Sequence, residues 1–166
     1  SEGAAGTGIK IKHTSHRTLS NVIAHDNVEY GVRVDADSNN ITINSSSAYS
    51  NGISGFMLTT DDGSSAHDVT LNGCAAYENT FYGVEVNDAN NAVISGCTIR
   101  GNSVDGIHLD NADRVAITGN MIYNNTTYGV SIDSSSSDSL LVGNVNTGNG
   151  TDVGGTGSFS VKDNNL

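Results

Sequence analysis

The sequence predicts an all-β solenoid, a parallel β-helix of about seven stacked coils. The first observation behind this prediction is a repeat in which a glycine precedes an apolar–any–apolar triplet. Its glycines are Gly8, Gly31, Gly55, Gly83, Gly106, Gly129 and Gly157, the last in a looser match. Successive glycines are 23, 24, 28, 23, 23 and 28 residues apart. A period in this range indicates stacked units that bury their apolar faces against one another.

The second observation is an asparagine that stands four residues before the repeat glycine. It is present as Asn27, Asn51, Asn79, Asn102 and Asn125, and Asn149 continues the series after a longer gap. Asparagine tolerates left-handed backbone angles, and its amide both donates and accepts hydrogen bonds. We therefore expect an internal ladder of these residues along one turn of the coils. An internal place also argues against Asn125 and Asn149 as glycosylation sites.

The third observation is the two-residue alternation of apolar positions, which suits β-strands and excludes helical repeats. Each coil contains three short strand-like segments, which in the central coil are residues 69–71, 74–77 and 83–86. The inward positions of the glycine strands form two apolar columns, Ile9, Val32, Phe56, Val84, Ile107, Val130 and Ile11, Val34, Leu58, Val86, Leu109, Ile132. The two steps of 28 residues predict loop insertions at residues 60–65 and 149–155.

The uninterrupted repeat predicts a single β-helix domain over residues 1–166. Seven Lys and Arg against 18 Asp and Glu give a formal net charge of −11, which argues against nucleic acid and anionic membranes as partners. No apolar run reaches the length of a membrane span. Neither end has an amphipathic cap, so we expect a fragment or uncapped segment of a longer β-helix, with a homo-oligomer or neighbouring domains at its ends. The low lysine content favours an extracellular, virion or cell-surface location.

Cys74 and Cys97 are 23 residues apart, which is one period, so they occupy equivalent places on neighbouring coils. Parallel strands lie about 4.8 Å apart, which is within disulfide reach by distance alone. Stacked side chains have parallel Cβ vectors, however, and these are poor geometry for a disulfide. We expect two buried free thiols, which leaves the redox compartment open.

Candidate chemistry lies on the outward positions of the glycine strands. These positions form two columns, Lys10, Arg33, Met57, Glu85, His108, Ser131 and Lys12, Asp35, Thr59, Asn87, Asp110, Asp133. Core positions would be apolar, so both columns are expected to face solvent or substrate. Because the first coils are basic, we expect an anionic polysaccharide to bind along this face. Its expected binding residues are Lys10, Lys12, Arg33, Asp35 and Asn87.

Glu85, His108 and Asp110 are the predicted catalytic group. Glu85 and His108 are neighbours in one column at a strand spacing of about 4.8 Å, and Asp110 follows on the same face. Carboxylates and an imidazole can divide the removal and return of a proton. Asp110 and Asp133 stack as like charges, which favours a bound cation such as Ca²⁺, although no calcium-binding motif accompanies them. The alternative is a solvated strand face whose mixed charges keep the rod soluble.

A further outward column lies two residues before the asparagine ladder. It contains His25, Tyr49, Tyr77, Arg100 and Tyr123. Three interpretations stay open for this column: a platform for sugar rings, a contact surface for another subunit, or a cover over the strand surface.

Residues 21–27, Asn-Val-Ile-Ala-His-Asp-Asn, the following Tyr30-Gly31-Val32 and the repeated Asn-x-x-x-Gly-apolar pattern resemble the β-helical module of mannuronan C5-epimerases. More broadly, the sequence resembles the pectate-lyase-like superfamily of right-handed parallel β-helices, which includes phage tailspikes. The epimerase motif is Tyr-Gly-Phe-Asp-Pro-His. Residues 82–87 read Tyr-Gly-Val-Glu-Val-Asn, so the tyrosine and glycine match, Glu85 replaces the aspartate, and neither the proline nor the histidine is present.

The resemblance implies an extracellular protein that engages polysaccharides, as a C5-epimerase or a polysaccharide lyase would. In such an enzyme Glu85 or His108 would handle the C5 proton, Tyr82 would assist, and a cation would neutralise the uronate carboxylate. The alternative is a non-catalytic structural β-helix, such as a tailspike, adhesin or filament segment that assembles through its sides or ends. The incomplete motif leaves both classes, enzyme and structural rod, open.

Overall fold

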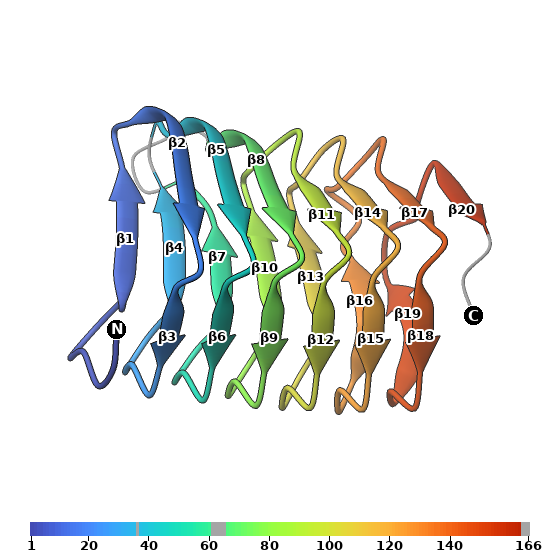
Figure 1. The fold of residues 1–166 in the computed structure, drawn as a ribbon. Helices are drawn as coiled ribbons and strands as arrows, with labels where there is room; N and C mark the ends of the chain where they lie inside the picture. Colours follow the sequence, from blue (N-terminus) through green and yellow to red (C-terminus); the bar gives the residue numbers. More distant parts are fainter. Residues whose placement is uncertain (36, 61–65, 164–166) are drawn as a thin grey trace.

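The computed structural model describes residues 1–35, 37–60 and 66–163, and it confirms the predicted right-handed parallel β-helix. The first six coils each contribute one strand to each of three sheets, and the last described coil contributes to two of them (Figure 1). Strands of neighbouring coils pair in parallel. The strand numbers within a sheet therefore increase in steps of three. Within the described residues there is no helix of the length and apolar character needed to cross a membrane.

We number the sheets I to III. Sheet I consists of β1 (Ile9–Lys12), β4 (Val32–Asp35), β7 (Phe56–Leu58), β10 (Val84–Asn87), β13 (Ile107–Asp110), β16 (Tyr128–Ile132) and β19 (Thr151–Gly155). Sheet II consists of β2 (Ser15–Ser20), β5 (Asn39–Asn44), β8 (His67–Asn72), β11 (Val93–Ser95), β14 (Ala116–Thr118), β17 (Leu140–Val142) and β20 (Val161–Asp163). Sheet III consists of β3 (Ile23–His25), β6 (Ser47–Tyr49), β9 (Ala75–Tyr77), β12 (Thr98–Arg100), β15 (Met121–Tyr123) and β18 (Val145–Thr147).

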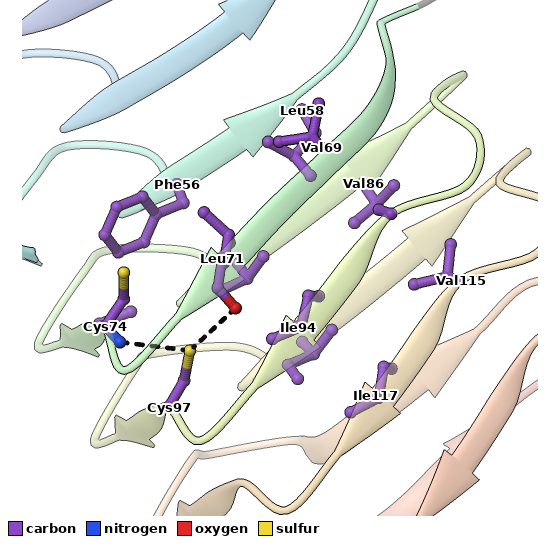
Figure 2. Packing of buried hydrophobic residues seen from close by; sticks show 14 of the residues in the cluster. Phe56, Leu58, Val69, Leu71, Cys74, Val86, Ile94, Cys97, Val115 and Ile117 are labelled. Atoms are coloured by element: carbon purple, nitrogen blue, oxygen red, sulfur yellow. Dashed lines mark hydrogen bonds between the residues drawn. The ribbon is translucent and has the colours of Figure 1, made fainter. Parts of the chain in front are cut away.

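The strands of sheet I pair in the register that the apolar columns predicted. Val84 lies opposite Ile107, and Glu85 lies opposite His108. Because side chains alternate along a strand, this register keeps all inward residues in the core and all outward residues on one face. The inward columns are buried apart from Ile9 and Ile11 in the first coil, which are partly buried. They meet the inward residues of the other two sheets in one core, part of which is shown in Figure 2.

The predicted asparagine ladder is confirmed. Each side-chain Nδ2 donates to the Oδ1 of the next asparagine, from Asn27 to Asn149, at 2.8, 3.0, 3.0, 2.9 and 2.9 Å. The ladder also explains the glycine repeat. A Cβ at Gly31 would lie 2.8 Å from Nδ2 of Asn51 and 2.7 Å from the carbonyl oxygen of Gly55. Asparagine and glycine therefore recur together because the stacked backbones approach too closely for a side chain.

The last coil of sheet I departs from the predicted repeat. β19 pairs with β16 so that Val153 lies opposite Val130. This register places Asp152, and not Gly157, at the position of the repeat glycine. Gly129 needs to lack a Cβ because one there would lie 2.7 Å from the carbonyl oxygen of Asp152. Within the described residues no further strand of sheet I stacks on Asp152, so a side chain is tolerated there.

The predicted insertions have different outcomes. The one at residues 149–155 is wrong, because residues 151–155 form β19 and continue the repeat without an extra loop. Gly157 resembles the repeat glycine by residue type alone, whereas the apolar residue Val153 sets the position of the strand. The insertion at residues 60–65 falls almost entirely on residues 61–65, which lie outside the described residues.

A second chain of hydrogen bonds, which the sequence pattern did not predict, runs along the turn before sheet III. The backbone N–H of Cys97 donates to Oδ1 of Asn120, and Nδ2 of Asn120 donates to Oδ1 of Asn144, both at 2.9 Å. One coil earlier, the backbone N–H of Cys74 donates to Sγ of Cys97 at 3.4 Å. Sulfur therefore takes the acceptor position that amide oxygens occupy in later coils. Both cysteines are buried free thiols, as predicted.

Candidate functional site

Glu85 lies at the centre of the candidate site, on the outward side of β10. The pairing of the strands sets it between Met57 on β7 and His108 on β13. Its side chain is nearly covered, with 9% exposed, and Oγ of Ser54 donates a 2.6 Å hydrogen bond to Oε2. Burial raises the pKa of Glu85, although the Ser54 hydrogen bond and the charge of His108 work against it. A carboxyl group with a raised pKa can accept a proton and return it near neutral pH.

His108 is held by two partners at the same ring nitrogen. Nδ1 lies 2.7 Å from Oγ of Ser131 and 3.1 Å from Oδ2 of Asp105, and Ser131 itself donates to that Asp105 oxygen at 2.6 Å. Burial alone would lower the pKa of His108, but the hydrogen bond and the charge of Asp105 outweigh it and raise the pKa. The arrangement favours a proton on Nδ1 and leaves Nε2 as the nitrogen for a ligand.

Tyr82 completes the group by stacking on His108. Its ring lies 4.4 Å from the imidazole, centroid to centroid, with an angle of 3° between the planes. Burial raises the pKa of Tyr82, and the negative charges of Glu85 and Asp105 add to the effect. The phenol therefore keeps its proton at neutral pH and can act as a donor beside the imidazole.

One positional rule connects these contacts. The side chain of the residue just before the repeat glycine contacts the outward strand residue of the next coil. Ser54 reaches Glu85 in this way, Tyr82 reaches His108, and Asp105 reaches Ser131. Ser54 and Asp105 were not among the site residues predicted from the sequence. The signal was the column of residues before the repeat glycines, where Asp105 is the counterpart of Tyr82 one coil later.

A hollow of about 290 Å³ adjoins His108 on its C-terminal side. Asp105, Tyr128, Ser131, Asp133 and Thr156 are among the residues that line it. This volume is near the lower end of the range for ligand pockets. The hollow therefore suits one small polar group or one unit of a longer ligand.

Asp110 and Asp133 lie side by side, as predicted, and Asp133 is one of the residues that line the hollow. Burial and the neighbouring Asp133 both raise the pKa of Asp110. Burial also acts on Asp133, but hydrogen bonds from Ser135 and Ser136 dominate and hold its pKa well below the usual range. Asp133 is thus the charged member and Asp110 the one that protonates first. The predicted cation at this pair stays a prediction.

The basic residues predicted to bind substrate lie at the other end of sheet I. Asp35 is fully buried, so the expectation that it faces solvent is wrong. The same expectation is wrong for four other members of the outward columns, which are also buried: Met57, Thr59, Glu85 and Ser131. Lys10 Nζ lies 2.9 Å and Arg33 Nε 3.4 Å from Oδ2 of Asp35, and the two cations cover the carboxylate. The strand order places Lys10 and Lys12 on β1, three coils from Glu85. The structure therefore does not bring these lysines together with the predicted catalytic group.

Two more predicted residues remain near the surface. Lys12 is exposed at the end of β1, and Asn87 is half-buried at the end of β10, one coil from Asp110. Asn87 is therefore the predicted substrate-binding residue that lies beside the catalytic group. The substrate-binding roles of all five predicted residues stay predictions.

The aromatic column on sheet III forms a continuous stack. The rings of His25 and Tyr49 lie 4.8 Å apart, those of Tyr49 and Tyr77 lie 4.7 Å apart, and the guanidinium of Arg100 lies 4.4 Å from the Tyr77 centroid. Both faces of Tyr49 and of Tyr77 are therefore occupied within the column. A platform for sugar rings needs free ring faces, so the geometry favours a cover over the strand surface.

Besides the Asp110 and Asp133 pair, two more donor sets for a metal are found among the described residues. One is Glu2, His25 and Asp26, an exposed to half-buried group whose ligand atoms all lie within 4.8 Å of one another. It provides two carboxylates and one imidazole, which suits hard cations. The other is the thiol pair of Cys74 and Cys97, which provides soft donors only. A hydrogen bond between the thiols lowers the pKa of Cys74 and raises that of Cys97.

Residues 2–165 match the model of a family described as periplasmic copper-binding protein (NosD). No curated protein matches the sequence. Among solved structures, the A-module of mannuronan C-5 epimerase AlgE6 from Azotobacter vinelandii is similar with a TM-score of 0.84 and 18% identity, over 98% of this chain and 54% of that one.

A mutant of the periplasmic alginate epimerase AlgG is similar with a TM-score of 0.82 and 15% identity, over 96% of this chain and 48% of that one. Pectate lyase Pel9A is similar with a TM-score of 0.67 and 20% identity, over 99% of this chain and 50% of that one. The chain therefore spans about half the length of the structures that it matches. Identities this low show a shared fold.

Proposed function

The chain belongs to the NosD family, and from this premise we propose that it is an exported β-helix that acts on uronate polysaccharides by moving the C5 proton. The observation that carries the proposal is the cluster of Glu85, His108 and Tyr82, which have raised pKa values on one face of sheet I. The names of the three similar structures specify mannuronan, alginate and pectate, which are all polyuronates.

The chemistry starts at the C5–H bond of a uronate, which is weakly acidic because it is adjacent to the carboxylate. Glu85 accepts this proton in its ionised form, and the electron pair moves into the carboxylate to give an enediolate. The His108 imidazolium lies next to Glu85 and stabilises the added negative charge. Asp105 and Ser131 act as positioning residues because they fix Nδ1 of the imidazole.

Two outcomes follow from this intermediate. If Tyr82 returns a proton to C5 from the opposite side, the sugar is inverted and the chain stays intact. If the C4–O bond breaks instead, its electron pair leaves with the glycosidic oxygen, which takes the Tyr82 proton, and a C4–C5 double bond remains. The first outcome is epimerisation and the second is a lyase reaction.

Substrate binding extends along sheet I from the cluster in the proposal. The hollow beside His108 takes the next sugar unit on one side, and Asn87 takes a hydroxyl group at the end of β10. Arg33, two coils from Glu85, and the more distant Lys10 and Lys12 interact with carboxylates further along the chain. Asp110 and Asp133 would hold Ca²⁺ if this cation binds, and its charge would neutralise the carboxylate of the bound uronate.

An exported location is part of the proposal. The family description and the name of AlgG both specify the periplasm. Polyuronates are found outside the cytoplasmic membrane, so enzyme and substrate would share a compartment.

The family description also favours a second role, copper binding. This role requires side chains in this chain that can act as copper ligands. The exposed Glu2, His25 and Asp26 set has one imidazole, and carboxylates are poor ligands for Cu(I). Cys74 and Cys97 are both free and provide the thiols that Cu(I) prefers. The thiol pair therefore fits the metal better, and it lies in the core, away from the sheet I cluster.

The enzyme proposal is tested by incubating the protein with polymannuronate, alginate and polygalacturonate, with and without Ca²⁺. Proton NMR separates C5 inversion from unsaturated chain ends. We expect one of these products from the wild-type protein and none from Glu85→Gln. Glu78→Gln is the matched control, because Glu78 is exposed on another face and pairs with Arg100. Absence of both products from all three polymers, or equal turnover by Glu85→Gln, overturns the proposal.

A further inference from the structure

We infer that Cys74 and Cys97 form a buried Cu(I) site that bridges two neighbouring coils. The inference rests on the proposed copper-binding role and is independent of the polysaccharide chemistry. The two residues occupy the same turn in coils that lie next to each other, just before the paired strands β9 and β12. Figure 2 shows both sulfur atoms turned into the core, that of Cys74 beside Phe56 and that of Cys97 beside Leu71.

The two thiols form a pair in the structure. Sγ of Cys97 accepts the backbone N–H of Cys74 at 3.4 Å, so the sulfur of one coil lies directly against the backbone that carries the other cysteine. Strand pairing sets equivalent backbone positions of neighbouring coils about 4.8 Å apart. Two soft donors are therefore presented side by side by rigid backbone, which is the requirement for a preorganised metal site.

The same turn shows what a purely structural solution looks like. In the next two coils the position is occupied by Asn120 and Asn144, which continue the column through amide hydrogen bonds of 2.9 Å. Each asparagine also donates to a backbone carbonyl of an earlier coil, Ile94 for Asn120 and Ile117 for Asn144, both at 2.9 Å. The thiols make the same kind of contact at longer distances, Cys97 to Leu71 at 3.7 Å and Cys74 to Ile43 at 3.4 Å. A thiol is a weaker donor and a weaker acceptor than an amide. The two cysteines therefore form weaker hydrogen bonds along this column than asparagines would, but they provide two sulfur ligands for a metal.

The surroundings of the pair select a monovalent soft ion. Within the described residues the thiols belong to no group of three or more histidine, cysteine or acidic side chains with ligand atoms close together. Zn²⁺ in structural sites takes four such ligands, whereas Cu(I) is stable with two thiolates. Phe56 and Leu71 keep the pair away from water, and the cysteines are 3% and 2% exposed. Binding releases the two thiol protons and forms two Cu–S bonds without a change in oxidation state.

Cu(I) competition tests the inference. The reduced wild-type protein is titrated anaerobically with Cu(I) in the presence of the chromogenic chelator bicinchoninate. We expect the protein to withdraw one Cu(I) per chain from the chelator. Cys74→Ser and Cys97→Ser are each expected to abolish this withdrawal, and His25→Asn, which alters the other donor set, is expected to leave it unchanged. Circular dichroism confirms that each variant keeps its strands.

A second measurement holds even if the serine variants do not fold. X-ray absorption on the Cu(I)-loaded wild-type protein is expected to show two sulfur neighbours and no nitrogen neighbour. Bound Cu(I) is also expected to raise the midpoint of thermal unfolding by several degrees, because it binds only the stacked coils. Nitrogen or oxygen neighbours, or binding that survives in the double serine variant, overturn the site and leave the copper role standing. No withdrawal of Cu(I) by the wild-type protein overturns both.

Discussion

Sheet I contains two groups of covered charge on the same outward columns, and they differ in how the charge is balanced. At β1 and β4 the buried carboxylate of Asp35 faces two cations, Lys10 at 2.9 Å and Arg33 at 3.4 Å. At β10 and β13, the imidazole of His108 lies 3.1 Å from Asp105, and Glu85 occupies the neighbouring strand position. The pKa values of Glu85 and His108 are both raised.

The backbone frame is the same in both groups, so the difference lies in the side chains alone. The Asp35 carboxylate is balanced by its two cations, and we assign Asp35 itself a structural role. Two carboxylates with one imidazole leave an excess of negative charge, which makes protons easy to exchange. Shifted pKa values of this kind are typical of functional sites, which is why we assign the chemistry to the middle of the rod.

The largest expected effect is on turnover. His108→Ala removes the cation that stabilises the enediolate, and we expect turnover of the active uronate polymer to fall by about 10²- to 10⁴-fold. His67→Ala is the control, because His67 lies on sheet II and pairs with Asp68. Product formation by NMR measures both variants. A His108 variant that retains wild-type turnover would show that the middle group is as inert as the N-terminal one.

The next effect is on stability, at the balanced group. Asp35→Asn leaves Lys10 and Arg33 facing each other across a neutral side chain. We expect the free energy of unfolding to fall by about 3 kcal/mol, which corresponds to a drop of about 6–12 °C in the unfolding midpoint. Asp37→Asn, at an exposed position of the same turn, is expected to change little. Enhanced turnover in the Asp35 variant would contradict a structural role for this group.

A smaller effect concerns the protonation of His108. Asp105→Asn removes the charge that raises the pKa of His108, so we expect that pKa to fall, as followed by NMR of the ring protons. The wild-type pKa is raised above the usual 6.5, so its stabilising contribution is complete below pH 6.5 and is lost as the pH rises through the folded pKa. In Asp105→Asn we expect the free energy of unfolding to lose this dependence on pH, as measured by chemical denaturation at a series of pH values above and below 6.5. An unchanged His108 pKa would refute the assigned role of Asp105.

The smallest effect is expected from Lys10→Gln. The Lys10 side chain is 39% exposed, and Arg33 still faces Asp35 after the change. We expect a loss of about 0–1 kcal/mol in the free energy of unfolding, measured by chemical denaturation. A loss as large as that of Asp35→Asn would mean that the two cations act as one unit.

The repeat made much of the fold predictable. The columns led by Ile9 and Ile11, the ladder from Asn27 to Asn149 and the buried thiols all followed from residues that recur at one period. In-register stacking imposes the same local environment on equivalent residues, so one coil predicts the next. The prediction failed at Asp152, where the glycine requirement ends because no further strand of sheet I stacks on it in the described part of the chain.

The candidate site was only partly predictable. The columns identified Glu85 and His108 as neighbours, and the pairing of β10 with β13 confirms this. They missed Asp105 and Ser54, because these residues lie before the glycine and reach the strand of a different coil. Alternation also predicted that Asp35 faces outward to solvent, whereas ion pairs with its neighbours bury it.

The sequence by itself determined the period, the sheet register and the residues that point inward, because these follow from backbone geometry that every coil repeats. Only the tertiary structure decided which outward side chains are covered, which of them pair, and where negative charge is left in excess. Those properties depend on contacts between different columns of adjacent coils, and the length and direction of each side chain set them. A one-column pattern contains no information about such contacts.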